Sequence, residues 1–208
     1  MKSDSQIIYF KSKRNKVRLY QGYIEKYHRS SEAAKFEADR LTRLYDAGLA
    51  VPRLLSVKDN MLQMEYIPSI PLPDLIGQWE TRQNIAVQEA VILGIVQWLA
   101  DYYRVVDINN TKETRGDING RNFLFDGEKV WGVDFEEQIY GVKEQDIGRL
   151  MAFILTYDPP ETQVKKTLTE IFLQKAVQEL DVNKLEVYKW RDSELQDIRR
   201  RRVSSVQL

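Results

Sequence analysis

The 208-residue sequence contains no cysteine and a single histidine, His28. It therefore excludes disulfide bonds, thiolate metal sites and any metal site built from several histidines. No stretch approaches the roughly 18 uninterrupted apolar residues of a membrane span, and the N-terminal residues MKSDSQIIYF lack the apolar core of a signal peptide. These absences predict a soluble, cytoplasmic protein that makes no membrane contact.

The sequence also lacks an excess of either charge, because 31 lysines and arginines balance 31 aspartates and glutamates. No overall electrostatic field therefore favours nucleic acid or an anionic membrane surface. We find no internal repeat and no linker rich in glycine, serine or proline. A chain of this length without a linker suits one domain, or two small lobes joined by a short crossover.

The most informative stretch, residues 114–138, reads TRGDINGRNFLFDGEKVWGVDFEEQ. Asp117 is followed five residues later by Asn122, and apolar runs on either side of an Asp-Gly turn predict a β-hairpin. The hairpin would bring Asn122 close to Asp134. A single aspartate usually caps or solvates a turn, but this ordered set matches what phosphoryl transfer requires. That reaction needs one carboxylate for the nucleophile's proton and oxygen ligands for magnesium.

The pattern D-x-x-x-x-N, then a hairpin, then D-F-E resembles the catalytic and metal-binding loops of the protein-kinase-like superfamily. It is most similar to the variants in aminoglycoside and choline phosphotransferases and in small atypical kinases. The resemblance implies an α+β, two-lobed fold, with a small β-rich N-lobe (1–67) and a mainly helical C-lobe (68–208). It also implies that ATP and Mg²⁺ are cofactors, that Asp117 is the catalytic base, and that Asn122 and Asp134 are metal ligands.

Residues 6–10 and 16–28 carry β-branched and aromatic side chains in loose alternation, which predicts short antiparallel strands. The link between them is basic and has no glycine, unlike the glycine-rich loop of protein kinases; aminoglycoside phosphotransferases also lack that loop. Whether Lys13 or Arg14 touches a phosphate stays open, and a solvated turn is the favoured interpretation. By the resemblance, Lys26 in the third strand would contact the nucleotide phosphates.

Residues 31–47 contain good helix formers with apolar positions near a 3.6-residue period, and Gly48 follows where a helix would end. The resemblance implies that Glu37 in this helix pairs with the strand lysine. Glu32 is the competitor for that role, and an exposed ion pair is the alternative for either glutamate.

Residues 54–57 and 61–67 predict a second hairpin, whose end reads M-E-Y-I-P. This end resembles the hinge that joins the lobes of a kinase and binds adenine. By that resemblance the Glu65 carbonyl and the Ile67 amide would hydrogen-bond the base, and Met64 would line its pocket. An ordinary apolar strand end is the alternative.

A helix start at PLPDLI and a long apolar helix over 81–106 precede the catalytic stretch. Arg115 stands two residues before Asp117, where the superfamily most often has a histidine. Arg121 faces either the cleft or solvent. Only about ten residues separate Asp134 from a helix containing Asp146, which by the resemblance supports the catalytic loop, with helix capping as the alternative.

Helices are also predicted over 159–180 and 183–202. The second ends in the one dense basic run, Arg199, Arg200, Arg201 and Arg202. A solvated helix end is the favoured interpretation, and a contact with RNA or an acidic protein partner is the alternative. The compact kinase of the KEOPS tRNA-modification complex is similarly short and also ends in a basic tail.

The sequence thus predicts an enzyme that moves the γ-phosphoryl group of ATP to a hydroxyl acceptor, either a small molecule or a protein serine. The short segment after Asp134 argues against a regulated protein kinase. The alternatives are an atypical kinase that acts as an ATPase or nucleotide-gated partner of another protein, and a pseudokinase scaffold.

Overall fold

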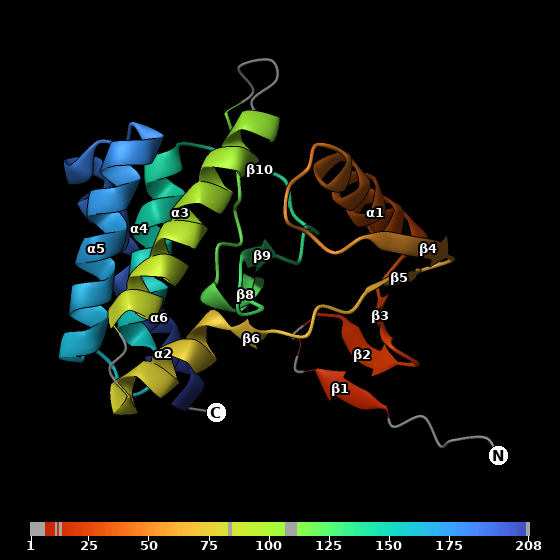
Figure 1. Ribbon diagram of the computed structural model, residues 1–208, viewed down its shortest axis with the longest axis horizontal. Coiled ribbons are helices and arrows are strands. Elements are labelled where there is room, and N and C mark those ends of the chain that lie inside the picture. Colours follow the sequence, from red (N-terminus) through yellow and green to blue (C-terminus); the bar gives the residue numbers. More distant parts are fainter. Residues whose placement is uncertain (1–6, 11, 13, 83–84, 107–111, 207–208) are drawn as a thin grey trace.

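The computed structural model describes residues 7–10, 12, 14–82, 85–106 and 112–206. Its N-terminal part is an antiparallel sheet of five strands, in the order β1-β2-β3-β5-β4, with one helix packed against it (Figure 1). The elements of this part are β1 (Ile8–Phe10), β2 (Lys16–Tyr20), β3 (Tyr23–Tyr27), α1 (Ser31–Asp46), β4 (Leu54–Lys58) and β5 (Met61–Glu65).

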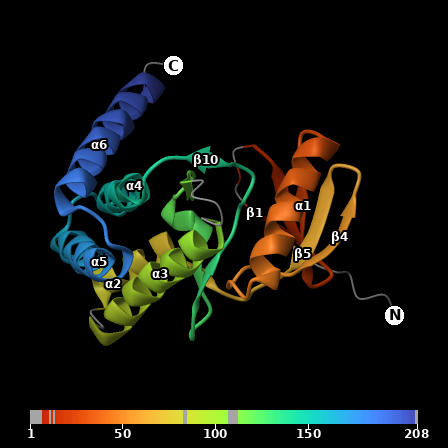
Figure 2. The same ribbon diagram turned by 90° about the horizontal axis from the view of Figure 1, so that it is seen from above.

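The C-terminal part is mainly helical, as Figures 1 and 2 show. A three-stranded sheet, β6-β8-β9, and a two-stranded sheet, β10-β7, lie between its helices and the N-terminal part. Its elements are β6 (Ile70–Pro71), α2 (Leu72–Thr81), α3 (Ile85–Val106), β7 (Glu113–Thr114), η1 (Gly120–Asn122), β8 (Phe123–Phe125), β9 (Val130–Gly132), β10 (Ile139–Tyr140), α4 (Lys143–Thr156), α5 (Gln163–Leu180) and α6 (Lys184–Val206). The α+β fold predicted from the sequence is confirmed.

Helix α1 forms where the sequence predicts it. The Ser30 side chain accepts a hydrogen bond from the backbone N–H of Ala33 at 3.2 Å and so caps the first turn. Buried Ala34 and Leu41 belong to a stripe that packs α1 against β4 and β5. Gly48, with φ +83°, follows the end of the helix. The helix therefore presents a fixed face to the sheet.

The predicted hairpin after Asn122 is present as β8 and β9. Gly132 in β9 lies against the ring of Trp98 from α3, and a Cβ added at this glycine would be 2.0 Å from a ring atom. The Trp98 ring stacks on Tyr102 with centroids 5.4 Å apart, and its Nε1 donates to the Ala50 carbonyl at 2.9 Å. Trp98 thus links α3, the hairpin and the chain that follows α1.

Two predicted helix boundaries are wrong. The helix predicted over 81–106 is interrupted, because α2 continues to Thr81 and ends where Arg82 takes an extended conformation. The helix predicted from Pro159 begins instead at Gln163, since the Thr162 side chain accepts from the Lys165 N–H and caps it there. Residue 6 of the predicted first strand lies outside the described residues.

Among the described residues, the structure contains no helix long and apolar enough to cross a lipid bilayer.

Candidate active site

Lys26 of β3 is the charged centre of the candidate site. Its Nζ lies 2.8 Å from Oε2 and 3.0 Å from Oε1 of Glu37 on α1, and it also donates to Oδ1 of Asp134. The Lys26 and Glu37 side chains are only 8% and 2% exposed, whereas that of Asp134 is 32% exposed. Of the two glutamates considered from the sequence, the structure pairs Glu37 with the lysine and leaves Glu32 exposed.

The surroundings of the Lys26–Glu37 ion pair raise the pKa of Lys26 and lower the pKa of Glu37, so both groups stay charged. Burial works against the charge on Glu37, but contacts with His28 and Lys26 and the Phe135 N–H outweigh it and lower the pKa of Glu37 to about 2. Burial also opposes the charge on Lys26, yet Glu37 and Asp134 raise the pKa of Lys26 above its ordinary value. The site therefore holds a stable ammonium group at neutral pH.

His28 and Glu136 complete a cluster of charged groups around Lys26. His28 Nε2 lies 3.0 Å from Glu37 Oε2, although the two atoms are not aligned as a hydrogen bond. The ligand atoms of His28, Glu37 and Glu136 lie within 4.8 Å of one another, a spacing that could hold a metal ion. However, the Lys26 ammonium already lies 3.9 Å from Glu136 and closer still to Glu37. We therefore interpret the Glu37 and Glu136 carboxylates as partners of the Lys26 ammonium and not as ligands of a metal ion.

The backbone on either side of Asp134 is fixed by buried side chains. Asp134 has φ +68°, which is uncommon for a residue with a side chain. The Arg115 Nη2 donates to the carbonyls of Val133 at 2.5 Å and of Asp134 at 2.6 Å, while the Phe135 N–H donates to Glu37 at 3.0 Å. These bonds hold the Asp134 side chain toward Lys26. Arg115, which replaces a histidine of the superfamily, thus has a structural role in this chain.

Asp117 and Asn122 lie on the loop between β7 and β8. Gly116, with φ +73°, turns the chain immediately before Asp117. The Asn122 Nδ2 donates to the Asp117 carbonyl at 2.9 Å, which leaves the amide oxygen of Asn122 for a cation. The Val133 N–H donates to the Asn122 carbonyl at 3.0 Å, so Asn122 is held beside the Asp134 loop, as the predicted hairpin requires. The Asp117 side chain is exposed.

Asp146 on α4 supports this loop from within the protein. It is fully buried and accepts hydrogen bonds from the backbone N–H groups of Arg115 at 2.6 Å and Gly116 at 3.3 Å, and from the Tyr103 hydroxyl at 2.8 Å. Burial outweighs these bonds and raises the pKa of Asp146. Its contacts match the loop-supporting position inferred from the sequence and not a simple helix cap.

The predicted hinge residues lie along the sheet from Lys26. Met64 of β5 is opposite Ile24 of β3, and Leu62 is opposite Lys26. Since cross-strand partners share a face, Met64 lies on the same face of the sheet as Lys26. Met64 and Ile67 are each 8% exposed. Beyond Glu65 the chain leaves the sheet toward β6, as the yellow segment in Figure 1 shows.

The turn between β1 and β2 also contacts the site, although the sequence favoured a solvated turn. Arg14 donates to Glu137, and the Asn15 Nδ2 donates to Glu136 at 2.5 Å. Lys13 lies outside the described residues. Sequence reasoning missed Glu136, His28 and Asn15. The one available signal was the first glutamate of D-F-E-E, Glu136, which stands two residues after the predicted metal ligand Asp134.

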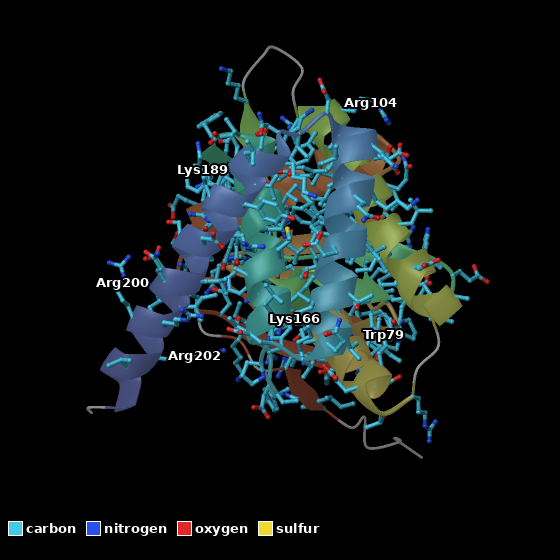
Figure 3. The ribbon with its side chains drawn as sticks, turned by 90° about the vertical axis from the view of Figure 1, so that its left-hand side faces the viewer. Trp79, Arg104, Lys166, Lys189, Arg200 and Arg202 are labelled. Carbon is cyan, nitrogen blue, oxygen red and sulfur yellow. The ribbon has the colours of Figure 1, made fainter. Side chains whose placement is uncertain are left out.

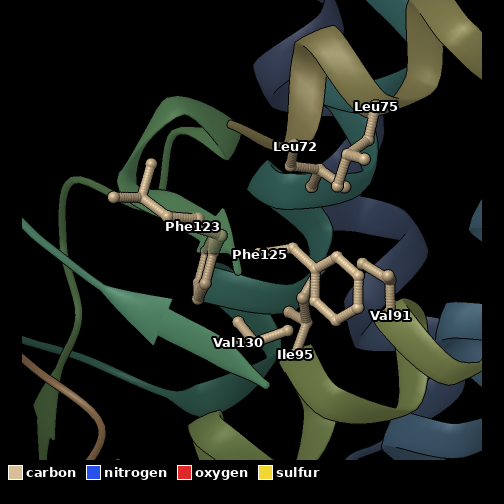
Figure 4. Close-up of a pocket in the computed structure, with 8 residues that line it drawn as sticks. Leu72, Leu75, Val91, Ile95, Phe123, Phe125 and Val130 are labelled. Atoms are coloured by element: carbon tan, nitrogen blue, oxygen red, sulfur yellow. The ribbon is translucent and has the colours of Figure 1, made fainter. Parts of the chain in front are cut away.

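The hollow in Figure 4 is separate from these charged groups. It is lined by side chains of α2, α3, β8 and β9 and is too narrow to admit a water molecule. The lining residues are Leu72, Leu75, Val91, Ile95, Phe123, Leu124, Phe125 and Val130. Because every one is apolar, the hollow is a gap in the core of the C-terminal part and not the site of the chemistry.

Comparisons with known proteins identify the family and the fold of the chain. The sequence profile of the RIO domain matches residues 5–152. No curated protein matches the chain in sequence. A solved structure, that of a choline/ethanolamine kinase family protein from Mesorhizobium loti, is similar with a TM-score of 0.53. The alignment covers 94% of this chain and 87% of that chain at 14% identity, and at that identity it shows the fold alone. Since the RIO profile spans well over half of the sequence, the chain belongs to the RIO domain family of atypical protein kinases, within the protein-kinase-like superfamily.

Proposed function

We propose that the chain is an ATP- and Mg²⁺-dependent phosphotransferase that moves the γ-phosphoryl group of ATP to a hydroxyl acceptor. One observation carries the proposal: the Lys26 ammonium contacts both Glu37 and Asp134. These residues come from a strand, a helix and a loop that are far apart in the sequence. The chain also belongs to a family of atypical protein kinases. Asp134 is partly exposed, so a cation can reach its carboxylate.

The residues present fit a magnesium nucleotide. Asp134 offers a carboxylate and Asn122 an amide oxygen, which are the hard oxygen ligands that Mg²⁺ prefers. When bound, the ion would neutralise charge on the phosphate oxygens. Lys26 would bind phosphate, and Glu37 would keep its ammonium oriented. Met64 together with the backbone of Glu65 and Ile67 would hold the adenine.

Asp117 would accept the proton of the attacking hydroxyl. Its side chain is exposed, so an acceptor can approach it, and its backbone is fixed by the turn at Gly116 and by Asn122. The acceptor would be a small molecule or a protein serine.

The experiment that tests the proposal is ATP turnover with Mg²⁺ for wild type, Asp117→Ala and a control, Asp59→Asn, at an exposed turn of the N-terminal sheet. We expect Asp117→Ala to lower the turnover rate at least about 100-fold, the usual scale for loss of a general base. The control should retain the wild-type rate. Undiminished turnover in Asp117→Ala would refute the assigned role.

The C-terminal arginines do not favour a second function. Arg199 lies 3.3 Å from Glu161, Arg201 lies 2.5 Å from Glu194, and the Arg202 Nη2 donates to the Thr156 carbonyl at 2.6 Å. Arg200 pairs with an aspartate of its own helix, and Figure 3 shows this side chain at the outer side of α6. These contacts favour attachment and solvation of α6 over nucleic-acid binding, so we propose phosphoryl transfer alone.

A further inference from the structure

A second buried ion pair holds α1, outside the residues assigned to nucleotide binding. Arg40 lies one turn after Glu37, and its Nη2 is 2.7 Å from Oε1 of Glu113 on β7. The two side chains are 10% and 3% exposed. A buried pair of this kind loses much of its stabilisation when one partner is removed, because the other charge is left buried and unpaired. The pair is therefore a strong candidate for fixing α1.

Glu113 connects this pair to both loops of the candidate site. It begins β7, which runs directly into the turn that carries Asp117. Its Oε2 accepts a hydrogen bond from the Gln138 Nε2 at 2.8 Å, and Gln138 lies four residues after Asp134. Arg40 thus contacts Glu113, which is hydrogen-bonded to Gln138 after Asp134 and lies four residues before Asp117 in the sequence.

Tyr102 on α3 completes the network. The Arg40 Nη2 donates to the Tyr102 hydroxyl at 3.0 Å, and this hydroxyl also lies 3.3 Å from the Thr114 carbonyl. Burial raises the pKa of Tyr102 to about 12, so the hydroxyl keeps its proton at neutral pH. The Arg40 Nε has no hydrogen-bond partner among the described residues, and the Arg40 Cζ lies 5.6 Å from the centroid of the Phe36 ring, so the Nη2 contacts are the ones that join Arg40 to β7 and α3.

The spacing of Glu37 and Arg40 explains how the network can act on the lysine. Residues three apart lie on the same face of a helix, and here that face meets the segment leading to β10 (Figures 1 and 2). Packing on β4 and β5 holds α1 against the sheet, and the Arg40–Glu113 pair adds a polar attachment one turn after Glu37, toward the chain that leads to Asp117. This attachment opposes rotation of α1 and so keeps the direction from which Glu37 approaches Lys26.

We propose that Arg40 and Glu113 are positioning residues that keep α1 in the orientation where Glu37 pairs with Lys26. Through Glu113 and its hydrogen bond with Gln138, the pair also joins α1 to the short segment 135–142 between Asp134 and α4. This inference rests on the proposed phosphotransferase function.

The test is a double-mutant cycle in Mg²⁺-ATP turnover, using Arg40→Gln, Glu37→Gln and the double variant. We expect Arg40→Gln to lower kcat at least about tenfold with KM for ATP changed less than about threefold, because the adenine contacts are untouched. In the Glu37→Gln background the same change should alter kcat by no more than about twofold. Arg40→Lys should recover part of the loss, and Arg43→Gln, exposed on the same helix, should behave as wild type.

A merely structural role predicts a different pattern. Full additivity of the two changes, or no effect of Arg40→Gln on kcat, would overturn the proposal. If Arg40→Gln does not fold, the isosteric Glu113→Gln takes its place in the cycle.

Hydrogen exchange of the nucleotide-free protein separates this inference from the proposed function. We expect Glu113→Gln to speed amide exchange in α1 at least about tenfold, whereas Arg43→Gln leaves it unchanged. Unchanged exchange in α1 would overturn the positioning role. A wild type without ATP turnover would refute the phosphotransferase proposal, and the exchange measurement would still decide whether the ion pair holds α1.

Discussion

The candidate site has acidic residues at its exposed edge, Asp117 and Asp134, and in its buried support, Asp146 and Glu37. The two groups differ in what their carboxylates contact. Asp117 has an exposed carboxylate, and that of Asp134 is 32% exposed although it also contacts Lys26. Asp146 and Glu37 are buried, and every oxygen of Asp146 is used to hold other groups. Substitution at the edge should therefore change activity with little effect on stability, whereas substitution in the support should change both.

The largest effect expected from this comparison concerns Asp146→Ala. It would leave two backbone N–H groups and the Tyr103 hydroxyl without their acceptor in a buried place. We expect a loss of about 3 kcal/mol or more in the free energy of unfolding, measured by urea denaturation. Asp117→Ala is the matched change at the edge and should stay within about 0.5 kcal/mol. Similar losses for the two variants would break the comparison.

Acid pH should expose the contribution of Glu37. Its pKa is about 2 in the folded protein and 4.5 ordinarily, so its stabilisation is present above about pH 4.5 and is lost as the pH falls toward 2. Wild type should lose stability across this window more steeply than Glu37→Gln. Urea midpoints at several pH values would show it, with Asp39→Asn, exposed on the same helix, as the control. Parallel curves for wild type and Glu37→Gln would contradict the assignment.

The smallest effect is expected far from the site, on α6. Arg200→Gln removes an exposed ion pair within one helix turn, which contributes at most about 0.5 kcal/mol. ATP turnover should remain within about twofold of wild type. A large loss of turnover would mean that α6 takes part in the site, and the comparison would have to include it.

Local patterns were enough to predict the hairpin and α1, whereas the pairing of Lys26 with Glu37 was implied by the family resemblance. The local signals are apolar runs around an Asp-Gly turn, and a 3.6-residue apolar period followed by Gly48. The roles of these residues in binding and transfer remain predictions, as do the hinge contacts of Met64, Glu65 and Ile67.

Contacts of residues that lie outside the recognised motifs could not be predicted. Arg40 and Glu113 are far apart in the sequence, and nothing near either residue distinguishes it from a surface charge. His28 has the same difficulty, because its place beside Glu37 depends on how β3 and α1 pack. The start of α5 was missed because a proline was preferred over the Thr162 side chain that caps the helix.

The most direct test of the central claim is isothermal titration of ATP, with and without Mg²⁺, into wild type and Asp134→Asn. Asparagine tolerates the positive φ of this position, so the backbone should be retained while the charge is lost. The account predicts Mg²⁺-dependent ATP binding by wild type that the substitution removes. Absence of binding at millimolar ATP, or binding that neither Mg²⁺ nor Asp134→Asn changes, would contradict it.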